Sequence, residues 1–151
     1  MNRLGKAIAV AAIAHQDQVR FDGSPYMLHC IRVMMRLSGE SEMICGICHD
    51  TIEDTEMTLE KLNSLIELTK EEAEAIDILT HKDCDSYDEY IQKVSQNALA
   101  KAVKISDLRD NMDLLGLPKL IQKDLLRAER YHKSFLALTG TPVATEQKGT
   151  P

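Results

Sequence analysis

Apolar residues recur along most of this chain at spacings of three and four, which is the period of a helix buried on one face. Alternating apolar and polar positions rich in β-branched residues, the mark of a strand, are nearly absent. The pattern predicts an all-α protein, a single bundle of about seven to eight helices. The expected helices cover approximately residues 2–19, 26–38, 41–53, 58–66, 70–81, 86–96, 98–115 and 118–138.

Several expected helix ends carry residues suited to that position. Thr69 and Glu72 have the spacing of a capping box, and so do Ser86 and Glu89. In this motif the two side chains accept hydrogen bonds from free backbone N–H groups of the first turn. Pro25 stands where a first helical turn begins, and the N–H that proline lacks is not needed there. These signals predict where three of the helices start.

The length of 151 residues is that of one ordinary domain. We expect residues 1–139 to form this domain. Residues 140–151, GTPVATEQKGTP, are rich in Thr, Pro and Gly and have little to bury. They are predicted to be a disordered C-terminal tail.

The net charge of −6 and the scarcity of aromatic residues (4%, with no Trp) argue against binding to nucleic acid. They do not exclude an anionic small molecule, because a metal ion or a local cationic site can override the global charge. No stretch of 18 apolar residues occurs, so no membrane span is expected. Residues 1–18 have a basic start and an apolar run, but helical spacing and the lack of a cleavage site argue against a signal peptide. The pattern makes no prediction about the oligomeric state.

Cys45 and Cys48 form a C-x-x-C pair. Such a pair can be a redox site or half of a zinc site, or simply two small apolar residues on a buried helix. A zinc site needs a second ligand pair, and a thioredoxin-like site needs a preceding strand; neither is apparent. The buried helix is therefore favoured, and reduced thiols indicate a cytoplasmic location.

The mainly apolar segment 44–55 carries His49, Asp50, Glu53 and Asp54. Polar groups on a buried helix are costly unless something satisfies them, and a metal ion would do so. Histidine and carboxylate are suitable ligands for Mn, Fe or Zn. The alternative is a solvated helix end, and this segment alone does not exclude it.

Two further segments add to the cluster. His29 lies among apolar neighbours one turn into a predicted helix, where, taken alone, it would be a core histidine. Asp107 lies among apolar residues, with Lys104 three positions before it and Asn111 four after it. Because this spacing places all three on one helix face, Lys104 is a candidate phosphate contact. Arg109 is a weaker candidate, for which surface packing is favoured.

The order H…HD…D resembles the HD phosphohydrolase superfamily. The closer similarity is to the hydrolase domain of RelA/SpoT-type alarmone enzymes and to the small alarmone hydrolases. It is carried by AHQDQVRFDGSPYMLH at 14–29, CHDTIEDT at 48–55 and KISDLRDNM at 104–112, and it extends over residues 7–115. The resemblance implies an HD-domain bundle.

The resemblance also implies a role for each site residue. The ligands of one divalent ion, usually Mn²⁺ in this family, would be His29, His49, Asp50 and Asp107. Glu53 and Asp54 match the acidic pair that handles the attacking water. Asn111 matches a nucleotide contact, and Arg20 matches a basic residue that packs on guanine. Phe21 departs from the family, which often has a second basic residue there.

The implied activity is hydrolysis of guanosine-3′,5′-bis(diphosphate), ppGpp, to GDP and pyrophosphate. The length predicts a hydrolase without a synthetase domain, whose partner is a small-molecule nucleotide. Alternatives are an HD phosphohydrolase for another nucleotide or phosphorylated metabolite, a non-catalytic nucleotide or metal sensor, and a purely structural helical domain.

Overall fold

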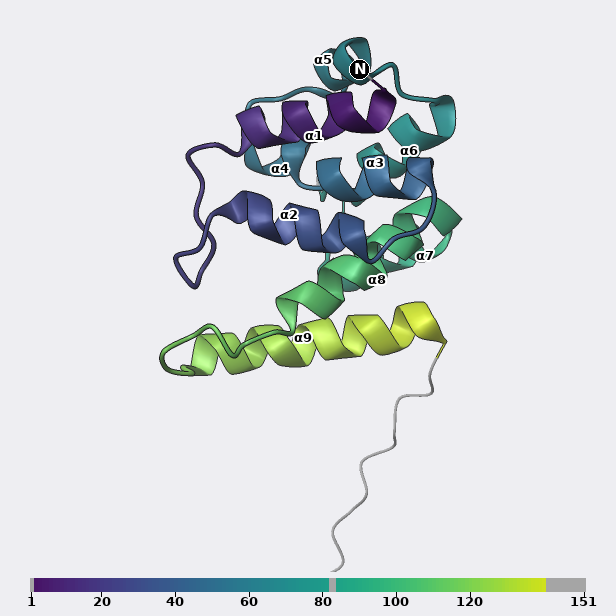
Figure 1. Cartoon of the computed structure of the whole chain (residues 1–151). Helices are drawn as coiled ribbons and strands as arrows, with labels where there is room; N and C mark the ends of the chain where they lie inside the picture. The colour runs from purple at the N-terminus through teal and green to yellow at the C-terminus, as the bar shows by residue number, and fades with distance from the viewer. Residues whose placement is uncertain (1, 82–83, 141–151) are drawn as a thin grey trace, which may run out of the picture.

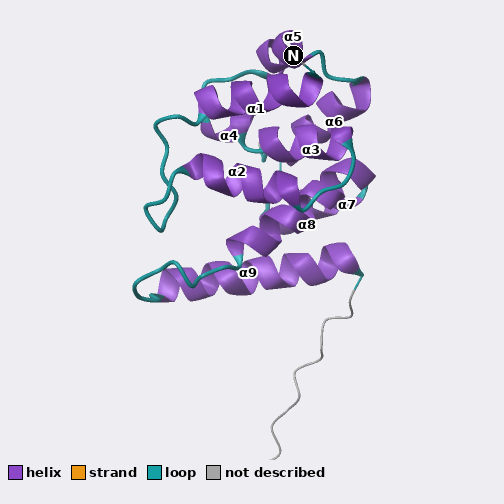
Figure 2. Ribbon diagram, viewed as in Figure 1, coloured by secondary structure: helices purple, strands orange, loops and turns teal. Residues whose placement is uncertain are grey.

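The computed structural model describes residues 2–81 and 84–140. Helices account for all the regular elements of these residues, apart from one isolated bridge between Val19 and Pro25 (Figure 1 and Figure 2). The predicted all-α bundle is confirmed. The helices are α1 (Arg3–Ala14), α2 (Tyr26–Met35), α3 (Glu40–Cys48), α4 (Thr51–Asp54), α5 (Leu59–Ile66), α6 (Lys70–Leu79), α7 (Tyr87–Ser95), α8 (Ala98–Asn111) and α9 (Gln122–Thr139).

The expected single helix over 41–53 is wrong, because the chain turns at His49 and Asp50 between α3 and α4. Consecutive residues of a regular helix project about 100° apart, so their side chains cannot reach one point. The turn removes this restriction. It brings His49 Nε2 within 2.8 Å of Asp50 Oδ2.

The expected helices around residues 112–121 also extend too far. The structure ends α8 at Asn111 and begins α9 at Gln122, with a loop between them. Leu115 is 95% exposed in this loop, and Leu120 and Ile121 are about half exposed. The apolar residues of this segment have no core to pack against, so their spacing does not indicate a buried helix face.

The predicted capping box at Thr69 is present, and the one at Ser86 forms only in half, because the Glu89 carboxylate accepts from the Asp85 N–H instead. Thr69 and Glu72 form a complete capping box at the start of α6, and the Ser86 side chain accepts from the Glu89 N–H at the start of α7. Helix α1, in contrast, ends at Ala14 rather than near residue 19. The expected tail at 140–151 lies, except for Gly140, outside the described residues.

Helix α3 is the centre of the bundle and contacts α1, α2, α6 and α8 (Figure 1). Its residues 44–48 are completely or almost completely buried. Cys45 and Cys48 belong to this core as free thiols, and burial raises the pKa of Cys48 to about 12. This agrees with their interpretation as small apolar core residues. Because α3 is held from all sides, His49 at its end has a defined position.

Gly46 allows α3 to approach α2 closely. A Cβ atom at this position would lie 2.5 Å from Leu37 Cδ1 and 3.3 Å from the Met34 Cα. Leu37 can move, but the Met34 backbone can yield only if the two helices separate. We expect Gly46→Ala to lower the free energy of unfolding by about 1–3 kcal/mol, the usual cost of overpacking. Urea unfolding would measure this; a stability equal to that of the wild type would contradict it.

Helix α9 crosses beneath α8 and contacts α7 as well (Figure 1). Ser134 and Leu138 are buried against the bundle. Arg130 and Tyr131, on the preceding turn, are thereby placed beside residues of α7 and α8. None of the described helices combines the length and the apolar character that a membrane crossing requires.

Candidate metal centre

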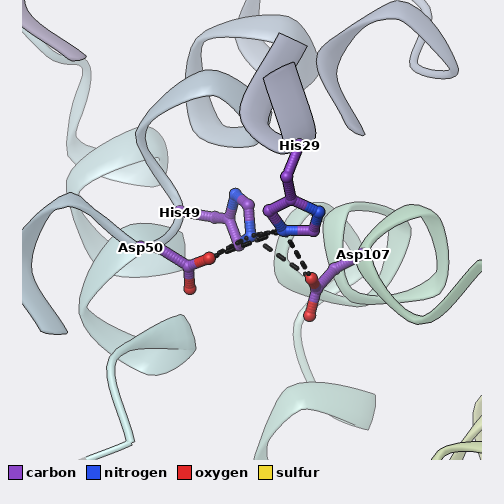
Figure 3. A group of neighbouring side chains, drawn as sticks. All are labelled: His29, His49, Asp50 and Asp107. Atoms are coloured by element: carbon purple, nitrogen blue, oxygen red, sulfur yellow. Dashed lines mark hydrogen bonds and ion pairs between the residues drawn. The ribbon is translucent and has the colours of Figure 1, made fainter. Parts of the chain in front are cut away.

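His29 from α2, His49 and Asp50 from the turn after α3, and Asp107 from α8 converge on one point (Figure 3). One potential ligand atom of each residue lies within 4.8 Å of those of the others. The two histidine Nε2 atoms are 3.3 Å apart, and His29 Nε2 is 3.1 Å from Asp107 Oδ1. The structure therefore brings together the four residues that the sequence singled out as ligands.

Each imidazole ring is held in its orientation by a hydrogen bond at Nδ1, the nitrogen that does not face the cluster. His29 Nδ1 lies 2.6 Å from Asp110 Oδ2, and His49 Nδ1 lies 2.7 Å from the carbonyl oxygen of Gly46. Each partner accepts a hydrogen bond, so Nδ1 carries the proton and the Nε2 lone pair faces the cluster. Outer hydrogen bonds of this kind accompany most metal-binding histidines.

The electrostatics of the cluster favour a cation. Burial disfavours charge on both histidines, but the hydrogen bonds that Asp107 and Asp110 accept outweigh it and raise the pKa of His29 to about 9. The pKa of Asp50 and that of Asp107 are both lowered, because burial is outweighed by the neighbouring positive charges. A divalent ion would supply the positive charge that protons otherwise supply. Two imidazole nitrogens and two carboxylates are a donor set that fits Mn, Fe or Zn.

Asp110 is a functional residue that the sequence analysis missed. It accepts from Arg32 Nε at 2.7 Å and from Arg36 Nη1 at 3.1 Å, in addition to the contact with His29. Burial would raise the pKa of Asp110, but the hydrogen bonds from His29 and Arg32 lower it. Its position three residues after Asp107 was the available signal, since this spacing places both on one helix face.

We expect Asp110→Asn to weaken metal binding about 10- to 100-fold, as changes to outer-shell partners of metal ligands commonly do. The asparagine amide carries no charge, so it binds the His29 Nδ1 proton less strongly. It also weakens the contacts to Arg32 and Arg36. Competition with a fluorescent chelator would measure the affinity. Asp113→Asn, an exposed neighbour on the same segment, is the control. Equal affinity of Asp110→Asn and the control would contradict a positioning role.

Glu53 and Asp54 lie on α4, directly beyond the candidate ligand Asp50, and are exposed. Partial desolvation, followed by the charges of Asp50 and Asp54, raises the pKa of Glu53 to about 7. The pKa of Asp54 is raised as well, by desolvation and then by Asp50. A carboxylate with a pKa near neutrality is suited to accept a proton from water.

A pocket of about 280 Å³ opens beside the cluster. Asp50 and Asp107 form part of its wall, and all three predicted substrate contacts, Arg20, Lys104 and Asn111, line it. Its remaining lining residues are Val19, Phe21, Tyr26, Tyr87, Arg130 and Tyr131. The sequence analysis missed the four cationic and phenolic groups of this set: Tyr26, Tyr87, Arg130 and Tyr131.

The predicted substrate contacts are also hydrogen-bonded to one another and to the cluster. Asn111 Nδ2 donates to Asp107 Oδ1 at 2.9 Å, and Lys104 Nζ donates to Asp107 Oδ2 at 2.7 Å. Arg20 donates to Asn111 Oδ1 at 2.9 Å, and its guanidinium lies 4.4 Å from the centre of the Phe21 ring. Arg109 does not line the pocket; it packs over the Phe135 ring at 5.2 Å, in agreement with surface packing.

Comparisons with known proteins give sequence relatives and one similar fold. No protein-family model matches the chain. A GTP pyrophosphokinase of Myxococcus xanthus is 31% identical over 126 residues, which are 73% of this chain and 17% of that protein. The bifunctional (p)ppGpp synthase/hydrolase SpoT of Escherichia coli K12 is 29% identical over 130 residues, covering 77% of this chain and 18% of SpoT. The chain thus spans about a fifth of the length of these curated relatives.

A solved structure described as a metazoan ortholog of SpoT that hydrolyzes ppGpp has a similar fold. The TM-score is 0.74 at 22% identity, and the match covers 95% of this chain and 89% of the other. The fold and the cluster define an all-α domain of the HD type. Its sequence relatives are RelA/SpoT-type (p)ppGpp synthetases and hydrolases, and the chain is similar to them over 73–77% of its length, as the resemblance in its motifs indicated.

Proposed function

We propose that this chain is a metal-dependent phosphohydrolase that converts ppGpp to GDP and pyrophosphate. The observation that carries the proposal is the convergence of two histidines and two carboxylates at the wall of a cationic pocket. The names of the relatives support the substrate: an Escherichia coli O157:H7 relative is a guanosine-3′,5′-bis(diphosphate) 3′-pyrophosphohydrolase.

We propose one Mn²⁺ ion as the cofactor, held by His29, His49, Asp50 and Asp107. When bound, such an ion polarises a phosphoryl oxygen and acidifies water. The described residues around the cluster offer no second set of ligand side chains.

Glu53 and Asp54 are proposed to take the proton from the attacking water. The water oxygen forms a bond to the phosphorus attached to the ribose 3′ oxygen, and the bond between this phosphorus and the 3′ oxygen breaks. The proton passes to the 3′ oxygen, which leaves as the hydroxyl of GDP. Lys104 offsets negative charge on the phosphate, and Asn111, which also donates to Asp107, contacts the nucleotide.

Arg20 and Phe21 are proposed to hold the base. The Arg20 guanidinium is buried, is hydrogen-bonded to Asn111 and packs over the Phe21 ring, so the exposed part of this ring is the part suited to stacking on a base. Phe21 is 40% exposed and has a second arginine, Arg127, 5.2 Å from its centre. An aromatic ring stacks on any base, so hydrolysis of another nucleotide is the second candidate function.

The decisive experiment loads the protein with Mn²⁺ and screens ppGpp, GTP, deoxynucleoside triphosphates and nucleoside monophosphates for released phosphate or pyrophosphate. Pyrophosphate from ppGpp is the expected result. Orthophosphate from a monophosphate would support the second candidate. A metal-loaded protein that turns over none of these compounds would favour a sensor.

Activity is expected to rise with pH through a limb at or below pH 7. Glu53 acts as a base only when ionised, and its pKa is about 7 without a metal ion; the added positive charge of a bound ion lowers it. The measurement is kcat/KM for ppGpp between pH 5 and pH 8. A profile that is flat over this range would contradict a titrating base.

A small-molecule nucleotide is proposed as the partner, without nucleic acid or membrane. A cytoplasmic location is proposed as well. The free thiols of Cys30, Cys45 and Cys48, buried in the core, are suited to a reducing compartment.

A further inference from the structure

Among the described residues, one buried side-chain polar atom has no hydrogen-bond partner, and it is the hydroxyl oxygen of Tyr87. A buried hydroxyl without a partner destabilises the fold, and native proteins rarely retain one without a reason. Tyr87 stands at the start of α7 and lines the pocket beside the metal cluster. Its hydroxyl is therefore a free hydrogen-bonding group at a ligand site.

Arg130 packs over the ring of the same tyrosine. The carbon of its guanidinium is 4.7 Å from the centre of the Tyr87 ring and 5.4 Å from that of Tyr131. Arg130 is exposed and lines the same pocket, and no carboxylate of the described residues forms an ion pair with it. Stacking on the two rings keeps the cation at the pocket while its N–H groups stay available to an anion.

A series of contacts places this pair relative to the cluster. Lys104 bonds to Asp107 at 2.7 Å, and the same ammonium lies 5.3 Å from the centre of the Tyr90 ring. The Tyr90 and Tyr87 rings are 5.7 Å apart. Lys104 therefore contacts both the cluster and the group of aromatic rings that includes Tyr87, and Lys104, Tyr87 and Arg130 all line the pocket.

We propose that Tyr87 and Arg130 form a subsite for the outer phosphate of the diphosphate group that is hydrolysed. This inference rests on the proposed function. The inner phosphate lies at the metal and Lys104, and the outer one accepts hydrogen bonds from the Tyr87 hydroxyl and the Arg130 guanidinium. The pair thus makes the chain select 3′-diphosphates over 3′-monophosphates.

The first test compares two substrates that differ by this one phosphate: ppGpp and guanosine 5′-diphosphate 3′-monophosphate. We expect Arg130→Gln to lower kcat/KM for ppGpp about 10- to 100-fold, the range of a lost charged hydrogen bond. Tyr87→Phe should lower it about 3- to 10-fold. Both variants should leave the monophosphate within about twofold of the wild type, within the scatter of a remote change. Equal losses on both substrates, or none, would overturn the subsite.

Arg109→Gln is the matched control, because Arg109 also packs over an aromatic ring of α9 but lies outside the pocket. It should resemble the wild type on both substrates. Thermal unfolding of Tyr87→Phe distinguishes a ligand-binding hydroxyl from one with a structural role, because the two predict different midpoints. Removing an unpartnered hydroxyl should leave the midpoint unchanged or raise it, whereas a structural hydrogen bond would lower it.

A binding experiment separates this inference from the proposed function. Calorimetric titration of the metal-loaded proteins with pyrophosphate and with orthophosphate needs no turnover. We expect the wild type to bind pyrophosphate more tightly, and Tyr87→Phe and Arg130→Gln to lose most of this difference. If the wild type does not hydrolyse ppGpp yet shows this pattern, the proposed function fails and the subsite stands. Unchanged pyrophosphate affinity in both variants would overturn the subsite, whatever the activity.

Discussion

Glu53→Gln is expected to lower kcat for ppGpp by about 10²- to 10⁴-fold, the usual contribution of a general base, while the metal content stays at that of the wild type. Glutamine keeps the size of the side chain but cannot accept the proton. Glu53 is not among the four clustered residues, so metal binding should not depend on it. Single-turnover kinetics and elemental analysis on the same samples would measure both quantities.

Glu56→Gln is the control for this variant, because Glu56 is another exposed carboxylate just after α4. It should keep wild-type activity. If Glu53→Gln is fully active and Asp54→Asn is not, Asp54 is the base. If both variants keep the wild-type rate, a role of this carboxylate pair in catalysis is excluded.

Glu53→Gln should also stabilise the metal-free protein at high pH. The pKa of Glu53 in the folded protein is about 7, above its ordinary value of 4.5, so the folded state loses stability as the pH rises through this interval. Glutamine carries no charge and avoids this loss. The urea midpoint of Glu53→Gln should therefore exceed that of the wild type at pH 8, and the difference should vanish below pH 4.

Asp107→Asn is expected to abolish metal binding and turnover and to lower the free energy of unfolding by about 3 kcal/mol, as the loss of one partner of a buried ion pair does. Asp107 is 5% exposed and Lys104 12% exposed at the side chain. Without the carboxylate, Lys104 keeps a largely buried charge that lacks its partner. Elemental analysis and urea unfolding would measure the two effects.

The double variant Lys104→Met and Asp107→Asn separates the effect on metal binding from the effect on stability. Removing both charges should recover most of the stability, because no unpaired charge remains. Metal binding should still be absent. A double variant that binds metal normally would show that Asp107 is not a ligand. Unchanged stability of Asp107→Asn would show that its pairing with Lys104 contributes little.

The site could be predicted from the sequence as far as residue identity goes. His49, Asp50 and Asp107 stand out as polar side chains among apolar neighbours, whereas His29 alone would be a core histidine, and the family resemblance implied the set of four. The structure places all four together, and Arg20, Lys104 and Asn111 line the adjacent pocket. The outer partners could not be predicted in this way. Spacing places Asp110 on the same face as Asp107, but the hydrogen bond that it accepts from His29, 81 residues away, depends on how α2 and α8 pack.

The sequence by itself thus determines features that depend on residues within one or two helical turns. These are the 3.6-residue period of the buried faces, the Thr69 cap, and the helix face shared by Lys104, Asp107 and Asn111. These depend on interactions between neighbours. The tertiary structure decides two other features: the turn at His49 and the position of Arg130 beside Tyr87. Both depend on how α3, α7 and α9 pack. Packing is decided by side-chain volume and buried area across the whole bundle, so only the folded molecule reveals it.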